Sequence, residues 1–305
     1  MAEYHSFEKW ASPDYWDDED WQTREAMGLE DRIEASQETP MALGTSKPAP
    51  TTSKLSGMEA LHTGKRKSPR RTMIYGDIGV RKSTLASKAN KPVFIDTEKG
   101  LADIDCESFV HETYDGVMGR IEWLTTADHD WGALNIDTVD LFENSLHTKL
   151  VDAEGQKSME DWDYQKGYVK AIPYWNKFID ALDLLQEKRD MAIILVAHCT
   201  IKAVNLPDAD RYDQYIPGMH KLATDRLTRW CTEVFFIGTK ILTTSEKHFN
   251  KKISKAIDGK LAIYTTKDPK HKAKNRLRLP NEITFEQAEQ VLRDGEWNDQ
   301  NKSNS

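Results

Sequence analysis

Nine consecutive residues combine the features that bind a phosphate group: a glycine-containing loop, a lysine and a serine. The pattern is Gly, four residues, Gly, Lys and then Ser or Thr, and Gly76, Lys82 and Ser83 match it. Backbone amides that curl around a phosphate form an anion-binding nest, and the following helix adds positive charge at its N-terminus. Lys82 is expected to reach the β- and γ-phosphates, and Ser83 to hold Mg²⁺. The predicted phosphate loop consists of Gly76, Asp77, Ile78, Gly79, Val80, Arg81, Lys82, Ser83 and Thr84.

Arg81 occupies the position where the pattern has its second glycine. A nest commonly needs a left-handed backbone, which costs a non-glycine residue about 1–2 kcal/mol. The long side chain is expected to crowd the nucleotide, whereas its positive charge favours nearby phosphates. We therefore expect nucleotide binding to survive this substitution, but we do not predict fast hydrolysis.

Two carboxylates follow short apolar segments. Asp137 ends the segment ALNID and is predicted to hold Mg²⁺, directly or through water, with a helix N-cap formed with Thr138 as the structural alternative. Glu98 follows PVFID and is predicted to orient the attacking water and accept its proton; a capping or solvated acid is the alternative. Asp96 lies two residues earlier on the same face of an extended segment. The choice between Asp96 and Glu98 therefore stays open, and we favour Glu98.

A histidine closes a third apolar segment, AIILVAH, at His198. A polar residue at the carboxyl edge of a central strand lies where ligands bind in open α/β sheets. We interpret His198 as a sensor of the γ-phosphate that relays its state to the following loop. A structural histidine at the end of the strand is the alternative.

The elements that must position these residues alternate between strand and helix. Apolar runs predict strands at residues 72–75, 92–96, 133–137, 192–197 and 233–238. Helices are predicted at 83–89, 168–188 and 285–294. Residues 241–244 and 261–266 are expected to pair as strands, with a basic loop at 247–255. This alternation predicts an α/β fold, a mainly parallel sheet flanked by helices.

The beginning of the chain differs in composition from the rest. Acidic residues at 14 and 17–20 are interleaved with Trp10, Tyr15, Trp16 and Trp21, and a stretch rich in Pro, Ser and Thr follows. Residues 1–62 are predicted to form a disordered tail and linker, since they offer too little apolar surface to order themselves. Alternatively, they form an acidic-aromatic peptide that docks on a partner, mimics single-stranded DNA, or covers a basic groove of its own domain. Residues 63–282 are predicted to form the nucleotide-binding domain, and 283–305 a short helix with a frayed tail.

Composition narrows the functional classes. The 305 residues carry a net charge of −8, so any nucleic-acid binding needs a local basic surface. Three cysteines share no metal-ligand spacing and are too few for a disulfide framework, which favours a reducing cytosol. The longest apolar stretch, residues 191–197, is far shorter than the roughly 20 residues of a membrane helix. With no secretory signal visible, we expect a cytoplasmic protein without a membrane partner.

The motifs resemble those of a known family. FIDTEKGL, ALNIDTVDLF and IILVAHCTIK follow the phosphate loop in this order and are similar to the corresponding strands of RecA and RadA recombinases. MIYGDIGVRKSTLA, DYQKGYVKAIPYW and AKNRLRLP resemble phage-encoded RecA-like ATP-binding proteins of the AAA/RecA type, including single-strand-annealing recombinases. The resemblance covers about residues 70–282. The sequence departs from the family pattern at Arg81, Asn135 and Arg278.

The resemblance implies a RecA-like P-loop NTPase fold that binds ATP and Mg²⁺. By this resemblance, nucleotide is bound by Lys82, Ser83 and Thr84, and the Walker-B acid, catalytic glutamate and sensor are Asp137, Glu98 and His198. It also implies a mobile DNA-binding loop at residues 201–221, with single-stranded DNA as the ligand. Further implied are a homo-oligomer whose neighbouring subunit completes the site, and a single-stranded-DNA-binding or recombination protein as partner. Lys274 and Arg276 are candidates for the contact with a neighbour, with a solvated basic loop as the alternative.

The leading functional prediction is an ATPase that acts on single-stranded DNA in phage recombination, replication or repair, in the cytoplasm of the host cell. An alternative keeps the fold but makes the protein a catalytically weak or inactive nucleotide-binding scaffold or switch. A P-loop kinase of small molecules is disfavoured, because no cluster of lid arginines lies between the phosphate loop and Asp137.

Overall fold

The structure is a computed structural model that describes residues 68–207, 209–240, 242–248, 251–257 and 259–297. The predicted disordered tail, residues 1–62, lies outside the described residues, as does the end of the predicted C-terminal tail. Among the described helices, none combines the length and apolar character needed to cross a membrane.

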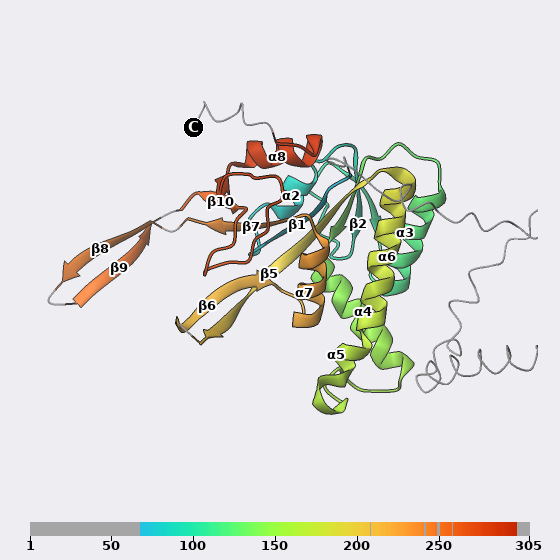
Figure 1. The fold of residues 1–305 in the computed structure, drawn as a ribbon, viewed down its shortest axis with the longest axis horizontal. Coiled ribbons are helices and arrows are strands. Elements are labelled where there is room, and N and C mark those ends of the chain that lie inside the picture. The colour runs from blue at the N-terminus through green and yellow to red at the C-terminus, as the bar shows by residue number, and fades with distance from the viewer. Residues whose placement is uncertain (1–67, 208, 241, 249–250, 258, 298–305) are drawn as a thin grey trace, which may run out of the picture. The chain divides into compact units, whose positions relative to one another are not determined.

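A nine-stranded, mostly parallel sheet forms the centre of the fold (Figure 1). Its strand order is β11-β10-β7-β1-β5-β4-β2-β3, and β6 pairs with β5 outside this path. The strands are β1 (Arg71–Gly76), β2 (Pro92–Asp96), β3 (Glu107–Val110), β4 (Ala133–Asp137), β5 (Ala192–Leu206), β6 (Ala209–Pro217), β7 (Glu233–Thr239), β10 (Leu261–Tyr264) and β11 (Glu282–Ile283). The strands from β7 to β3 are parallel, while β10, β11 and β6 pair antiparallel. The predicted α/β class is confirmed.

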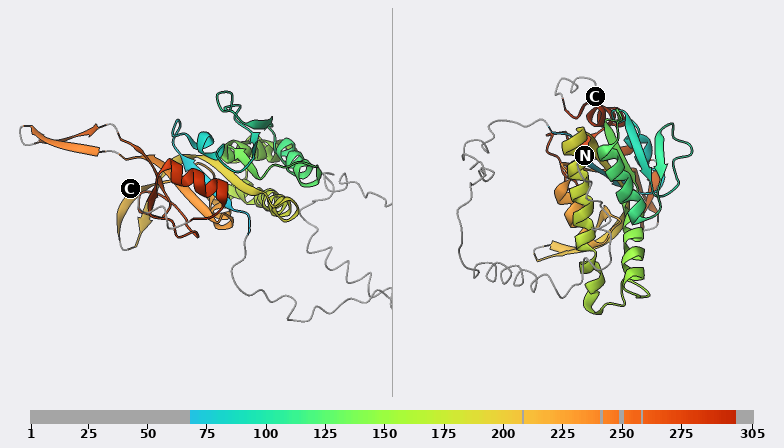
Figure 2. Two further views of the ribbon diagram at one scale, coloured as in Figure 1. Left: turned by 90° about the horizontal axis from the view of Figure 1, so that it is seen from above. Right: turned by 90° about the vertical axis from the view of Figure 1, so that its right-hand side faces the viewer.

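Helices cover both faces of this sheet (Figures 1 and 2). They are α2 (Lys82–Ala86), α3 (Tyr114–Thr126), α4 (Val139–Ala153), α5 (Lys166–Lys170), α6 (Ile172–Arg189), α7 (Lys221–Trp230) and α8 (Phe285–Asp294). Strand side chains alternate between two cores: Met73 and Tyr75 pack in the core of α3, α4, α6 and α7, whereas Ile74 packs in that of α2 and α8. Because both faces are buried, the central strands are mostly apolar, which is why the sequence predicts them well.

The register brings the polar strand ends together. Asp96 of β2 lies opposite Asp137 of β4, and Gly76 of β1 lies opposite His198 of β5. In parallel strands the carboxyl ends share one edge of the sheet, which is the usual place for a ligand. The order β1-β5-β4 places His198 between the phosphate loop and Asp137.

Three predicted elements need correction. Strand β5 does not close at His198 but runs on to Leu206, because its second half pairs antiparallel with β6. The helix predicted at 168–188 is divided into α5 and α6, since Pro173 lies in the first turn of α6 and cannot continue the preceding helix. The pairing expected between 241–244 and 261–266, with a basic loop at 247–255, is wrong. Strand β8 (Leu242–His248) pairs with β9 (Lys251–Ile257), so most of the predicted loop lies in strands, and β10 pairs with β7 and β11.

Candidate functional site

The phosphate loop connects β1 to α2 and has a strongly constrained backbone. A Cβ added at Gly76 would lie 2.4 Å from the Ile237 carbonyl oxygen, so glycine alone fits beside β7. Gly79 has φ 78° and Arg81 has φ 66° and ψ 32°, both left-handed. The left-handed geometry expected for a nest is therefore present, and Arg81 adopts it despite its side chain.

The Arg81 side chain is directed to the C-terminal helix. Its guanidinium carbon lies 5.0 Å from the centroid of the Phe285 ring, at the start of α8. This distance is typical of a cation–π contact, which contributes about 0.5–1 kcal/mol at an exposed site. The contact holds the guanidinium against α8, so in this position the side chain does not crowd the nucleotide as we expected.

Lys82 and Ser83 begin α2 immediately after the loop. The Lys82 ammonium donates to the carbonyl oxygens of Gly76 (3.2 Å) and Asp77 (2.8 Å) and is 6% exposed. Burial lowers the pKa of Lys82, while the nearby carboxylates of Asp137 and Asp140 oppose this shift. The Ser83 hydroxyl is close enough to the Asp137 carboxylate to lower its pKa, against the larger effect of burial. The structure therefore places Ser83 and Asp137, the two predicted metal ligands, near each other.

Asp137 ends β4 as a buried carboxylate. It is 2% exposed, and its Oδ1 atom has no hydrogen-bond partner among the described residues. Burial raises its pKa to about 6, and the neighbouring acids Glu98 and Asp96 add to this shift. Asp137 is not the N-cap of α4. Thr138 takes that position, and its side chain makes no capping hydrogen bond.

Asp96 and Glu98 have different surroundings. Asp96 is 3% exposed, and its Oδ1 accepts the amide hydrogens of Glu98 (3.1 Å) and Lys99 (2.7 Å). The Glu98 side chain is 40% exposed, and its Oε1 lies 3.8 Å from Nε2 of His198. Asp96 therefore holds the turn that carries Glu98, and Glu98 is the acid with access to a ligand.

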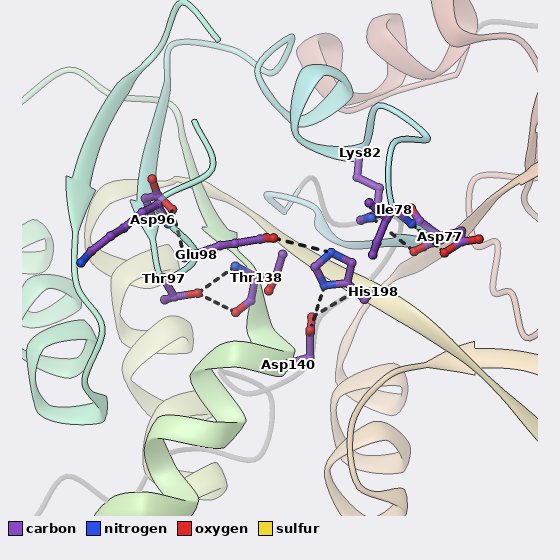
Figure 3. Close-up of polar contacts among 11 residues, drawn as sticks. Asp77, Ile78, Lys82, Asp96, Thr97, Glu98, Thr138, Asp140 and His198 are labelled. Carbon is purple, nitrogen blue, oxygen red and sulfur yellow. Dashed lines mark hydrogen bonds and ion pairs between the residues drawn. The ribbon is translucent and has the colours of Figure 1, made fainter. Parts of the chain in front are cut away.

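His198 is held by an acid that the sequence prediction missed. Asp140, in the first turn of α4, accepts the His198 backbone amide (3.0 Å) at one oxygen and contacts its ring Nδ1 (2.9 Å) at the other. Figure 3 shows Glu98 and Asp140 reaching the ring from different elements. The hydrogen bond to Asp140 raises the pKa of His198. The sequence offered one indication of Asp140, which is its position. Asp140 follows Asp137, the end of β4, by three residues, and an acid in the first turn of the next helix can face the same edge of the sheet.

Polar bonds also join the ends of β2 and β4. The Thr97 hydroxyl donates to the Thr138 carbonyl oxygen and accepts its amide hydrogen, both at 2.8 Å (Figure 3). Asn135 lies two residues before Asp137 and is fully buried, and both polar atoms of its side chain have no partner among the described residues. The structure gives no physical account of this amide.

These residues fit Mg²⁺. Asp137 offers a buried oxygen without a hydrogen-bond partner among the described residues, and the Ser83 hydroxyl is near the same carboxylate. Within the described part of the chain, no group of three His, Cys, Asp or Glu side chains is placed to hold a metal by itself. This arrangement suits Mg²⁺, which commonly binds through one or two carboxylates together with phosphates and waters.

The predicted DNA-binding loop at 201–221 is instead mostly a hairpin, β5–β6, followed by the start of α7. Tyr215 stacks on Phe236 with ring centroids 5.1 Å apart, and His220 stacks on Tyr168 at 3.9 Å. These two rings pack against rings of the fold, although Tyr215 stays 38% exposed; Lys202 and Arg211 are exposed as well. The sequence could not show these ring contacts, because a ring that is free to stack on a base and a ring that is packed in the fold have the same residue type.

A basic cavity lies beside this hairpin. Residues 267–278 hold six Lys or Arg residues and one acid. Part of this segment lines a cavity of about 630 Å³ together with Tyr212, Gln214, Thr228, Arg229 and Val234. Lys272 pairs with Asp225 (3.2 Å), and Lys274 donates to the carbonyl oxygens of Thr228 (3.0 Å) and Arg229 (2.7 Å). Of the two candidates for contact with a neighbouring subunit, Lys274 is thus engaged at the end of α7, and Arg276 is exposed.

A family model and a solved structure are similar to this chain. A family model described as an AAA domain matches residues 68–277. No curated protein matches the chain. Among solved structures, the crystal structure of the RadB recombinase is similar, with a TM-score of 0.35 and 12% sequence identity, over 68% of this chain and 91% of that chain.

Proposed function

Because the chain belongs to the AAA domain family, we propose that it binds ATP with Mg²⁺ at the loop between β1 and α2 and hydrolyses it. This proposal rests on five residues that lie together at one edge of the sheet. They are Lys82, the neighbouring Ser83 and Asp137, and the pair Glu98 and His198, whose Oε1 and Nε2 atoms are 3.8 Å apart. This set contains a cation for phosphates, ligands for a metal, and an accessible carboxylate.

Each residue has a role that its geometry permits. Lys82 uses two of its three N–H donors on the loop carbonyl oxygens, which leaves one for a phosphate. Ser83 and Asp137 would hold Mg²⁺, which neutralises charge on the phosphates when it is bound. Glu98 would orient a water molecule and accept its proton, and His198 would sense the γ-phosphate. The remaining loop residues would surround the phosphates with backbone amides.

The alternative function is a scaffold that binds nucleotide without turnover, and the conformation of Arg81 does not favour it. Its backbone already has the left-handed geometry, and its side chain is held on Phe285. The strain is therefore confined to the loop backbone, where it costs about 1–2 kcal/mol in folding and does not remove a catalytic group.

We also propose that the protein acts on single-stranded DNA. The basic cavity supports this: Arg229 and Lys267 are exposed cations, and Tyr212 supplies a ring at its wall. Cations for phosphates combined with an aromatic ring for a base are typical of proteins that bind single strands. By family resemblance, the biological setting would be phage recombination, replication or repair in the host cytoplasm. ATP would then lie between subunits of a homo-oligomer, and a single-stranded-DNA-binding or recombination protein would be a partner.

The test uses the full chain with ATP, Mg²⁺ and oligonucleotides. Lys82→Ala is expected to weaken ATP binding by about 100-fold, since it removes a charged hydrogen-bond donor. Glu98→Gln is expected to leave ATP binding within about twofold and to lower kcat by roughly 10²–10⁴-fold, as for loss of a general base. Binding is measured by calorimetry and hydrolysis by phosphate release, with and without single-stranded DNA.

Two exposed substitutions serve as matched controls. Lys88→Ala follows α2 and Glu122→Gln lies on the surface of α3, so both should behave like the parent protein. Unchanged ATP affinity in Lys82→Ala would remove the site assignment. ATP binding without any turnover in the parent protein would favour the scaffold.

A further inference from the structure

Asp140 makes two separate hydrogen bonds to a single residue, His198. One carboxylate oxygen accepts the backbone amide at 3.0 Å, and the other lies 2.9 Å from ring Nδ1. The Asp140 side chain is 14% exposed and that of His198 is 25% exposed. Because the backbone and the ring are held by the same carboxylate, the ring has little freedom to rotate about its χ1 and χ2 bonds.

The chemistry of this contact selects one form of the imidazole. An ionised carboxylate only accepts hydrogen bonds, so Nδ1 must carry a hydrogen. The hydrogen bonds from His198 lower the pKa of Asp140 against the effect of its burial, which keeps that carboxylate charged. The neutral ring therefore presents an unprotonated Nε2, and the protonated ring presents an Nε2–H donor.

The free edge of the ring faces the proposed catalytic groups. Nε2 lies 3.8 Å from Oε1 of Glu98, beyond hydrogen-bond distance but close enough for a charge interaction. Figure 3 shows His198 in the gap between Glu98 and the loop that carries Lys82. The charged groups that act on the ring are Asp140 from α4, Glu98 after β2 and Lys82 from α2.

We propose that Asp140 is a positioning residue of the nucleotide site: it fixes the tautomer and orientation of His198, so that Nε2 always faces Glu98 and the bound phosphates. This proposal rests on the proposed function, since it assigns Asp140 to the same site. Asp140 itself does not touch the nucleotide. It acts through the ring, and its loss should change the response of His198 more than the affinity for ATP.

A purely structural role makes a different prediction. An acid in the first turn of α4 stabilises that helix by interaction with its dipole. Asp140→Asn would then lower stability slightly and leave the ring tautomer unchanged. The decisive measurement is therefore the state of the ring, which helix stability does not affect.

The experiment records long-range proton–nitrogen NMR correlations of the histidine rings in the full chain labelled with ¹⁵N-histidine. His198→Gln identifies the His198 signals by their loss. In the parent protein we expect the neutral ring to carry its hydrogen on Nδ1. In Asp140→Asn we expect a mixture of tautomers and a lower pKa of His198, and in Asp140→Glu a return toward the parent pattern. Asp152→Asn, an exposed acid on the same helix, should have no effect.

A second readout links the ring to the nucleotide. Addition of Mg²⁺ and a non-hydrolysable ATP analogue should shift the Nε2 signal in the parent protein, and shift it less in Asp140→Asn. Affinity for the analogue should stay within about twofold, while kcat falls roughly 10-fold or more, as expected when a group near the reacting atoms is misaligned.

The outcomes separate the two proposals. A His198 tautomer that is the same in the parent and in Asp140→Asn overturns the positioning role, whether or not ATP is hydrolysed. A ring that changes in Asp140→Asn but does not respond to the analogue in the parent also overturns it, because the ring then does not face the phosphates. A parent protein that binds no analogue overturns the proposed function, and the ring tautomer still reports whether Asp140 fixes His198.

Discussion

At Arg81 the backbone and the side chain have separate effects. The residue has φ 66°, which is strained for an L side chain, and its guanidinium gains a contact with Phe285. Strain lowers the stability of the folded protein, whereas the contact with α8 raises it. Two substitutions distinguish these effects, because glycine removes both and alanine removes only the contact.

We expect Arg81→Gly to unfold with a free energy about 1 kcal/mol higher than that of Arg81→Ala, since both lack the contact and only alanine keeps the strain. Urea unfolding monitored by fluorescence measures the difference. We also expect hydrolysis by Arg81→Gly to stay within about threefold of the parent, because the guanidinium lies on α8. A gain of tenfold or more in kcat would show that Arg81 limits turnover after all.

The sequence selected candidate residues that have a fixed place along the chain, and the structure places them at one edge of the sheet. Lys82 and Ser83 come at the end of a glycine loop, and Asp137, Glu98 and His198 end or follow apolar runs, so local spacing and the family resemblance were enough to select them. Asp140 was missed because its role depends on which side of α4 faces β5, which is set by helix packing and not by local spacing. The contact of the Arg81 side chain with Phe285 could not be predicted for a similar reason, since Phe285 is about 200 residues away in sequence and only the fold brings it near.

The first two turns of helix α4 contact β5 and the segment that follows β6. Asp140 holds His198 in β5, and one turn later Glu143 accepts the backbone amide of His220, just after β6, at 2.8 Å. Glu143 is 5% exposed, and its second oxygen has no hydrogen-bond partner among the described residues. The helix that follows the Asp137 strand therefore anchors the hairpin through two carboxylates.

Glu143 should make stability depend on pH. Burial raises its pKa to about 7, whereas the carboxyl of the unfolded chain has an ordinary pKa near 4.3. Between these values the folded protein keeps a proton that the unfolded chain releases, so its free energy of unfolding falls as pH rises through this window. Glu143→Gln stays neutral and still accepts the His220 amide hydrogen. We expect it to be more stable than the parent by about 1–2 kcal/mol at pH 8 and equally stable at pH 4.

Thermal or urea unfolding at several pH values checks this, with Asp152→Asn on the same helix as the control. Titratable groups that interact with Glu143 include Asp140, whose charge raises the pKa of Glu143, the Tyr168 hydroxyl, and His147, whose Nε2 lies 4.0 Å from Oε1 of Glu143. A stability difference that is the same at pH 4 and pH 8 would contradict the assignment to Glu143.

Among the secondary-structure elements, the sequence predicted best the strands that are buried on both faces of the sheet. The strands at 92–96 and 133–137 were predicted with their observed bounds, because fully buried parallel strands are almost wholly apolar. The hairpin β5–β6 was predicted as a loop from the family resemblance, and its exposed charges, such as Lys202, Arg211 and Asp213, gave no apolar pattern that indicates strands. Pairing between strands depends on partners far along the chain, and so β10 was assigned the wrong neighbour.

Charge is divided unevenly over the whole molecule. Residues 1–64 hold 13 of the 50 acidic residues and 5 of the 42 basic ones, so the rest of the chain holds 37 of each. The net charge of −8 thus belongs entirely to the first 64 residues. The remaining chain is neutral overall, and its basic segment at 267–278 gives a local positive surface.

We expect this acidic segment to weaken the binding of nucleic acid by repulsion. Replacing Asp17, Asp18, Glu19 and Asp20 by Asn or Gln in the full chain should tighten binding of a single-stranded oligonucleotide by about three- to tenfold at low salt, because a polyanion then meets four fewer negative charges. The gain should disappear at about 1 M salt, where charges are screened within roughly 3 Å. Fluorescence anisotropy measures the affinity.

Adding Arg229→Glu and Lys267→Glu to the variant with four neutralised acids should abolish the gain by reversing the charge of the basic cavity, while the exposed control Lys88→Glu should not. If neutralising the four acids leaves the affinity for the oligonucleotide unchanged at low salt, the acidic segment does not weaken the binding of nucleic acid.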